Sequence, residues 1–167
     1  PHDYAAFVNP MIGTGGHGHT FPGPTLPFGM IQPGPDTRIN GWDACSGYYY
    51  ADSTINGFSH THLSGTGCGD YGDILIMPTV GKQNYLPLTQ GTQTLPYASK
   101  FSHTNETATP GYYSVYLDTY QVRAELTSTK RTAMHRYTFP ASKESGFLFD
   151  LDYSLQGQRN NKMQLEI

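Results

Sequence analysis

Charged residues and cysteines are both scarce in this chain. Only 14% of its 167 residues are charged, and the formal net charge is -3 at pH 7. The ten Lys and Arg residues are scattered and form no basic stripe. Binding to a polyanion needs clustered positive charge, so nucleic acid is not an expected partner. A surface rich in Tyr, Asn, Gln, Ser and Thr suits an uncharged, hydroxyl-rich ligand better.

Cys45 and Cys68 are the only cysteines, which is too few for a disulfide scaffold or a four-thiolate zinc site. A disulfide between them and two separate thiols are both compatible with the sequence. We favour free thiols, because both cysteines lie in Gly-rich segments with a functional character. No apolar run is long enough to cross a membrane.

No signal peptide is visible, and the chain starts at Pro1 rather than Met. Its last residues, 161–167, have the pattern of a strand that stops midway. We therefore expect a single domain, residues 1–167, that is truncated at its C-terminal end and comes from a larger protein.

The remaining composition predicts an all-β fold. Gly 19 and Pro 12 punctuate the chain and leave no convincing helix, and aromatic residues must supply much of the core. Apolar residues alternate with polar ones in several short segments, which is the period of a half-buried strand. The expected strands are 48–50, 57–62, 73–77 (ended by Pro78), 113–117, 122–126, 133–139 and 147–153.

Two of these segments show the alternation over their whole length. Ala133, His135, Tyr137 and Phe139 share one face of their strand. In the last strand Phe147, Phe149, Leu151 and Tyr153 share one face, with Asp150 and Asp152 opposite. Short strands of period two with frequent turns predict antiparallel sheets, most simply a β-sandwich with long Gly/Pro-rich loops.

The segment from Asn9 to Asp36 is the most informative part of the chain. It is packed with Gly and Pro, yet it also places histidines, phenylalanines and methionines at specific positions. A flexible linker lacks such large apolar anchors. We expect a long ordered loop that carries function.

Two His-x-His pairs, His17/His19 and His60/His62, are candidate metal ligands. Residues i and i+2 of an extended strand face the same side, so each pair could hold one ion and the two pairs together could supply four imidazoles to zinc, copper or iron. The alternative is that these histidines bond to backbone groups or to a polar ligand.

Trp42 is the only tryptophan. Its neighbours Gly41 and Asp43 indicate a loop, so we interpret Trp42 as a stacking platform for a sugar ring rather than as a core anchor. Residues 59–73 alternate small and polar side chains, but they lack the lysine and the helix of a phosphate-binding loop. Asp70 and Asp73 could be a carboxylate pair for glycoside hydrolysis, although turn capping explains them more simply.

Five motifs together resemble the N-terminal signature of glycoside hydrolase family 92. They are Asn9-Pro-Met-Ile-Gly-Thr-Gly, His17-Gly-His-Thr-Phe-Pro-Gly-Pro, Pro27-Phe-Gly-Met-Ile-Gln-Pro-Gly-Pro-Asp, Ser46-Gly-Tyr-Tyr-Tyr and Gly57-Phe-Ser-His-Thr-His-Leu-Ser-Gly-Thr-Gly-Cys. Members of this family are bacterial exo-acting α-mannosidases, many specific for α-1,2 linkages.

The resemblance implies an N-terminal β-sandwich followed by a C-terminal (α/α)6 barrel, with the active site between them. It implies inversion of configuration and dependence on calcium, with the general acid, the general base and most calcium ligands in the C-terminal domain. The chain would then hold no catalytic residue and be inactive alone. Trp42 would pack against the leaving-group sugar, Cys45 would line the same pocket, and the carbonyl of Ile12 would reach the calcium.

We expect the substrate-binding residues to be Trp42, Cys45, His17, His19, His60, His62 and Asp70. The expected partners are a mannose-containing glycan and the protein's own C-terminal domain, with a dimer through the exposed interdomain face and a periplasmic or secreted location in a bacterium. A non-catalytic carbohydrate-binding module and a metal-dependent β-fold enzyme that uses the histidine pairs are the alternatives.

Overall fold

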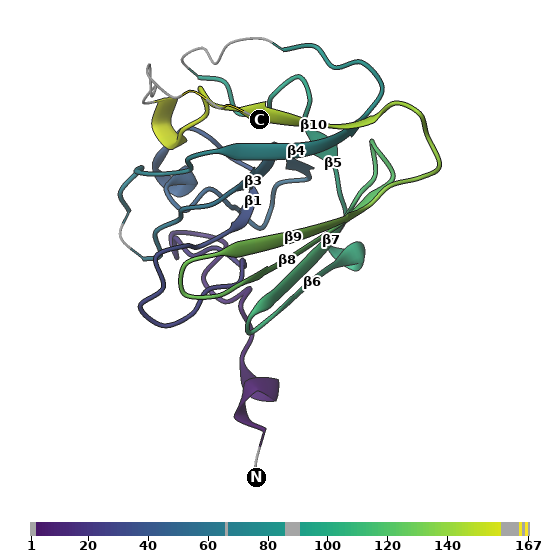
Figure 1. The fold of residues 1–167 in the computed structure, drawn as a ribbon. Coiled ribbons are helices and arrows are strands. Elements are labelled where there is room, and N and C mark those ends of the chain that lie inside the picture. Colours follow the sequence, from purple (N-terminus) through teal and green to yellow (C-terminus); the bar gives the residue numbers. More distant parts are fainter. Residues whose placement is uncertain (1–2, 66, 86–90, 158–163, 165, 167) are drawn as a thin grey trace.

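Residues 3–65, 67–85, 91–157, 164 and 166 are described by the computed structural model, and their strands form two four-stranded sheets and one two-stranded pair (Figure 1). The first sheet has the order β1 (Gly34–Asp36), β3 (Gly57–Ser59), β4 (Leu75–Val80), β10 (Ser145–Asp150). The second has the order β6 (Glu106–Thr109), β7 (Tyr112–Leu117), β8 (Val122–Ser128), β9 (Ala133–Thr138). β2 (Thr54–Ile55) pairs with β5 (Ser99–Lys100). Every pairing is antiparallel, which confirms the predicted fold class.

The helices of the described residues are all short 3-10 turns. They are η1 (Tyr4–Phe7), η2 (Trp42–Ala44), η3 (His103–Asn105) and η4 (Leu155–Gly157). None of these described helices has the length and apolar character to cross a membrane. The prediction of no substantial helix holds over this part of the chain.

The second sheet is a meander, and its strands are those that alternation locates best. In β8, Val122, Ala124 and Leu126 are buried, whereas Arg123 and Glu125 lie on the other face. On that face Glu125 pairs across the strands with Arg136 of β9. Opposite charges directly across an antiparallel pair stabilise it modestly. A two-residue turn at Pro110-Gly111, with Gly111 at φ 80°, joins β7 to β6, a strand that the sequence analysis missed.

The first sheet departs from three predictions. Residues 48–50 form no strand, and the strand expected over 57–62 ends at Ser59. β4 also runs through Pro78 to Val80 instead of stopping there. β3 pairs with β4 only at Phe58–Ile76, so one side of β4 has no ladder at Pro78 and tolerates a residue that lacks an N–H.

The end of β10 was predicted incorrectly as well. The strand stops at Asp150, so Leu151 and Tyr153 do not continue the face of Phe147 and Phe149. Asp150 is buried, and the Tyr97 hydroxyl compensates its carboxylate by donating a hydrogen bond at 2.5 Å. Phe147 remains 50% exposed, with its ring centroid 5.3 Å from that of Tyr137 on β9.

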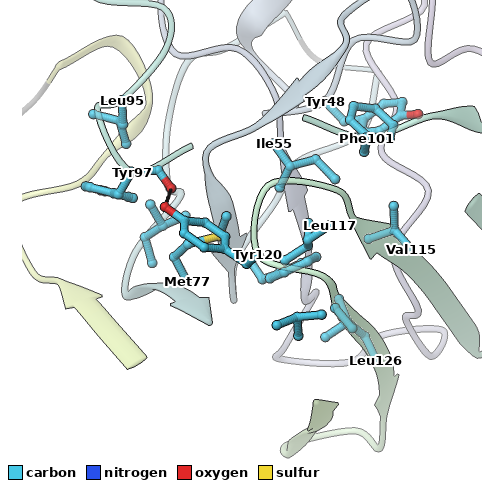
Figure 2. Packing of buried hydrophobic residues seen from close by; sticks show 14 of the residues in the cluster. Tyr48, Ile55, Met77, Leu95, Tyr97, Phe101, Val115, Leu117, Tyr120 and Leu126 are labelled. Carbon is cyan, nitrogen blue, oxygen red and sulfur yellow. Dashed lines mark hydrogen bonds between the residues drawn. The ribbon is translucent and has the colours of Figure 1, made fainter. Parts of the chain in front are cut away.

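One cluster of buried side chains lies between the sheets and extends under the loops (Figure 2). Tyr48, Tyr97, Tyr113 and Tyr120 bury their rings and keep their hydroxyls bonded, as buried tyrosines usually do, whereas the buried Tyr153 hydroxyl has no hydrogen-bond partner among the described residues. Tyr120 donates to the carbonyl of Tyr97 at 2.8 Å, and Tyr48 and Tyr113 both donate to the Glu106 carboxylate. The core therefore tolerates many polar rings without unpaired hydroxyls at these positions.

The position of the core predicts that truncating two methionines to alanine changes the free energy of unfolding by different amounts. Met77 on β4 is 0% exposed, whereas Met134 on β9 is 67% exposed. We expect Met77→Ala to lower the free energy of unfolding by about 2–5 kcal/mol through lost burial and a residual cavity. Met134→Ala should change it by less than about 0.5 kcal/mol. Urea unfolding followed by circular dichroism measures both, and equal effects would contradict this placement of the core.

Candidate functional site

The loop of residues 9–36 is ordered by close backbone contacts. Thr20 donates from its backbone N–H to the carbonyl of Gly13 and from its hydroxyl to the carbonyl of Ile12 at 2.9 Å. Gly18 packs so tightly on this turn that a Cβ there would lie 2.2 Å from the Gly13 oxygen. The backbone N–H of Tyr50 donates to the Thr14 carbonyl and ties the turn to the next segment. The predicted ordered loop is present.

His17 and His19 from this loop converge on Asp43. Nδ1 of His17 is 2.7 Å and Nε2 of His19 is 3.3 Å from the same Asp43 oxygen. His17 is largely exposed, whereas His19 is buried and has φ 54°. The hydrogen bond from His17 lowers the pKa of the Asp43 carboxyl against the opposing effect of desolvation, and the bond from His19 adds to the lowering. Asp43 is therefore a carboxylate at neutral pH.

Trp42 stands beside this group and is 63% exposed. Its ring meets the His19 ring edge-on, with centroids 5.0 Å apart. Gly67 lies under the other end of the indole, where a Cβ would be 2.6 Å from Cη2 of Trp42. The side-chain amide of Gln156 donates at 2.7 Å to the carbonyl of Gly41, the residue before Trp42. The indole is thus exposed and contacted by His19 and Gly67, and its role as a stacking platform stays a prediction.

A polar pocket of about 400 Å³ opens beside Trp42 and Asp43. Its other walls are Thr37, Arg38, Asn40, Gly41, Ala51, Asp52, Ser53, Thr54, Gln93 and Thr94. Arg38 forms a two-point ion pair with Asp52, at 2.5 and 3.1 Å, and its guanidinium lies 4.0 Å above the Tyr49 ring. The Gln93 side chain accepts from the N–H groups of Ile39 and Asn40. Amide, hydroxyl and charged groups therefore offer hydrogen-bond donors and acceptors beside an exposed aromatic ring.

His62 is separate from this pocket and braces the loops from below. It is buried against Asp36, with 2.7 Å between Nε2 and the carboxylate, and Nδ1 donates to the Gln32 carbonyl at 2.7 Å. Desolvation opposes its positive charge, but Asp36 and the Gln32 carbonyl outweigh it and raise the pKa of His62. A raised pKa contributes stability that is full below about pH 6.5 and is lost as pH rises through the folded value.

His60 instead stacks on His135 of β9, with ring centroids 4.8 Å apart. Its Nδ1 donates to the Ile74 carbonyl at 2.8 Å. Because β3 ends at Ser59, His60 and His62 do not share a strand face. The hypothesis of one four-imidazole metal site is therefore wrong: His60, His62 and the His17/His19 pair lie in three different surroundings.

The other candidate residues occupy different positions. Cys45 is buried directly after η2, Cys68 is exposed, and neither cysteine forms a disulfide. Burial, followed by the charge of Asp43, raises the pKa of Cys45, so it is not a reactive thiolate. Asp70 is exposed in the loop before β4. Asp73 accepts from the Thr61 hydroxyl at 3.2 Å, as the turn-capping interpretation requires.

The described residues offer one cluster of three or more potential metal ligands, formed by His17, His19 and Asp43. Calcium takes six to eight oxygen ligands. The Ile12 carbonyl accepts the Thr20 hydroxyl and has no carboxylate cluster beside it in this part of the chain. The described residues alone therefore do not fit a calcium ion.

Sequence reasoning did not single out Asp43, Arg38, Gln93 or Gln156. Asp43 directly follows the tryptophan, which is a usable signal, but its two histidine partners are more than twenty residues away. Gln156 is 115 residues from Gly41 and has no local signature at all. Only the folded chain brings these residues to one place.

Comparison with known proteins shows what this arrangement is similar to. Residues 7–167 match the glycosyl hydrolase family 92 N-terminal domain. An α-mannosidase of family GH92 from Bacteroides thetaiotaomicron, solved in complex with mannoimidazole, is 44% identical, with a TM-score of 0.85 over 92% of this chain and 20% of that one. An inverting mannosidase of the same family and organism is 30% identical, with a TM-score of 0.71 over 87% of this chain and 19% of that one.

A curated relative, an uncharacterized secreted glycosidase of Arthroderma benhamiae, is 30% identical over 142 residues. That alignment covers 83% of this chain and 18% of the relative. The chain thus spans about a fifth of the length of the relatives it matches.

The contact between Gly67 and Trp42 predicts a selective effect of one methyl group. Gly67→Ala should displace the indole and shift the emission of Trp42, the chain's only tryptophan. Gly65→Ala is the matched control: Gly65 has a similarly positive φ of 73°, but a Cβ there meets nothing within 4 Å. Both variants carry backbone strain, and only the first should change fluorescence. The same shift in both would rule out the packing contact as its cause.

The half-buried His135 predicts a loss of stability in acid. Burial first, and then the neighbouring His60, lowers the pKa of His135 to about 4. Between about pH 6.5 and 4 the unfolded chain binds a proton that the folded chain excludes. Stability should fall over this window by up to about 1.4 kcal/mol per pH unit.

His135→Gln should reduce that slope, as measured by urea unfolding at several pH values. Met134→Gln, the same side chain placed on the exposed neighbour, should keep it. An unchanged slope in His135→Gln would contradict the assignment.

Proposed function

The chain belongs to glycoside hydrolase family 92 and matches the N-terminal domain of its members. From this we propose that the whole protein hydrolyses terminal α-mannosides of glycans. The observation that carries the proposal is the exposed indole of Trp42 at the rim of a polar pocket. Indole faces stack on the C–H faces of sugar rings, and the surrounding hydroxyl and amide groups can bond sugar hydroxyls.

This chain supplies binding surface rather than the reacting groups. The two carboxylates that line the pocket are Asp43 and Asp52, and both are already paired, with histidines and with Arg38. A general acid of a glycosidase needs a raised pKa, whereas the pKa of Asp43 is lowered. The acid and base would therefore come from the remaining four-fifths of the protein, and the isolated chain would be inactive.

The finer features of the proposal rest on the family. The reaction would invert configuration, prefer α-1,2 linkages and depend on calcium, whose ligands would come mainly from outside this chain. One relative is described as an inverting mannosidase, which supports inversion. A relative described as secreted supports a location outside the cytoplasm, in the periplasm or beyond, and the Bacteroides relatives support a bacterial source.

The half-exposed phenyl rings of Phe147 and Phe149 on β10 favour a contact surface. Apolar patches of this kind are usually covered by another part of the protein or by a second copy. We propose that this surface meets the rest of the protein, and that the isolated chain dimerises through it.

The proposal predicts a division of labour that activity assays can measure. The whole protein should release mannose from α-1,2-mannobiose, with nuclear magnetic resonance reporting the β-anomer first and EDTA abolishing turnover. The isolated chain should release none. Hydrolysis by the isolated chain would overturn the division, and tight mannose binding by it would favour a carbohydrate-binding module.

Trp42→Ala in the whole protein should lower kcat/KM about tenfold or more, since aromatic stacking contributes about 1 kcal/mol beyond area burial. Tyr4→Ala removes a ring of similar exposure, 73% against 63%, from η1, away from the sheets, and should leave kcat/KM unchanged (Figure 1). Equal losses in both variants would remove Trp42 as the platform.

A further inference from the structure

His17, His19 and Asp43 have the donor atoms of a transition-metal site. The ligand atoms of the three side chains all lie within 4.8 Å of one another. Two imidazole nitrogens and a carboxylate oxygen are ligands that zinc, copper and nickel accept readily. We propose that these three residues bind one divalent transition-metal ion, with zinc as the natural occupant.

The distances already approach those of a bound ion. With zinc–ligand bonds of about 2.0–2.1 Å, tetrahedral ligand atoms lie about 3.3 Å apart. One Asp43 oxygen is 2.7 Å from Nδ1 of His17 and 3.3 Å from Nε2 of His19. Separating the closer pair by less than 1 Å, and bringing the two imidazole nitrogens from within 4.8 Å of each other to about 3.3 Å, admits the ion, which replaces the two hydrogen bonds. Each neutral imidazole then carries its proton on the other ring nitrogen.

Two of the three ligands are held in place, and the third is free to admit the ion. The His19 carbonyl accepts from the Gly65 N–H at 2.5 Å, and its ring packs against Trp42. Asp43 is part of η2. The His17 side chain is 78% exposed, so the ion can enter without opening the fold. Three protein ligands leave one coordination position for water or a sugar hydroxyl.

The chemistry of the donors separates this site from calcium. Nitrogen donors disfavour a hard cation, which takes oxygen ligands. The buried pair of His62 with Asp36, in contrast, has no third ligand atom in reach among the described residues. The proposed ion would join the loop of His17 to η2 next to Trp42, and this inference stands whether or not the protein is a mannosidase.

Cobalt titration of the whole protein, with calcium in excess to fill oxygen sites, tests the inference. Wild type should bind one Co²⁺ with the strong visible absorption of a four-coordinate ion, and Zn²⁺ should displace it. His17→Asn and Asp43→Asn should each weaken binding at least about tenfold, since even outer-shell changes cost 10–100-fold.

His103→Asn is the matched control. His103 also pairs with a carboxylate, Glu106 at 2.6 Å, but lacks a second imidazole, so this variant should bind cobalt as wild type does. Quenching of Trp42 emission by Cu²⁺ in the isolated chain gives a second readout. Absence of saturable cobalt binding, or equal binding by His17→Asn and wild type, would overturn the proposal. Because the His17 side chain is exposed, His17→Asn should fold as wild type does, and weaker cobalt binding by this variant would not reflect unfolding.

Discussion

The buried pair of His62 and Asp36 is the contact on which the loop-rich half of the molecule depends. His62 reaches the Gln32 carbonyl and the Ser59 hydroxyl, and Asp36 lies at the end of β1. Gly47 packs against both side chains, since a Cβ there would be 2.0 Å from the Asp36 carboxylate. Removing one partner of a fully buried pair leaves an uncompensated charge and costs several kcal/mol. Three segments that carry little regular structure are therefore held in one arrangement.

That arrangement positions the segment that carries function. Gly47 follows η2 by three residues, and its carbonyl accepts from the N–H groups of Thr37 and Arg38. The His62–Asp36 pair is thus connected through Gly47 to the segment that carries Trp42 and Asp43. A pocket wall made of loops must be rigid to recognise a ligand, because ordering it on binding would cost conformational entropy. Here the ordering is completed by folding, through buried polar contacts rather than through long strands.

The sequence allowed prediction of the second sheet better than the first. In β7, β8 and β9 the alternation of apolar and polar residues follows directly from one buried and one solvent-facing side. Tyr48 to Tyr50 have strand propensity but lie in a loop, because tertiary bonds to Thr14 and Thr37 satisfy their backbone. The local pattern predicts that Asp150 faces solvent, yet in the interior it accepts a hydrogen bond from Tyr97 of a distant segment. Local pattern cannot report a partner that is fifty residues away.

By itself the sequence determined the fold class, the ordered loop, the exposed position of Trp42 and the family, since these depend on residue type, period and contiguous motifs. The tertiary structure alone decided how the histidines divide: His17 and His19 converge on Asp43, His62 becomes a buried brace, and His60 stacks on His135. The physical reason is that a short polar side chain takes its role from the groups within hydrogen-bonding distance. In this chain those groups come from segments that only folding brings together.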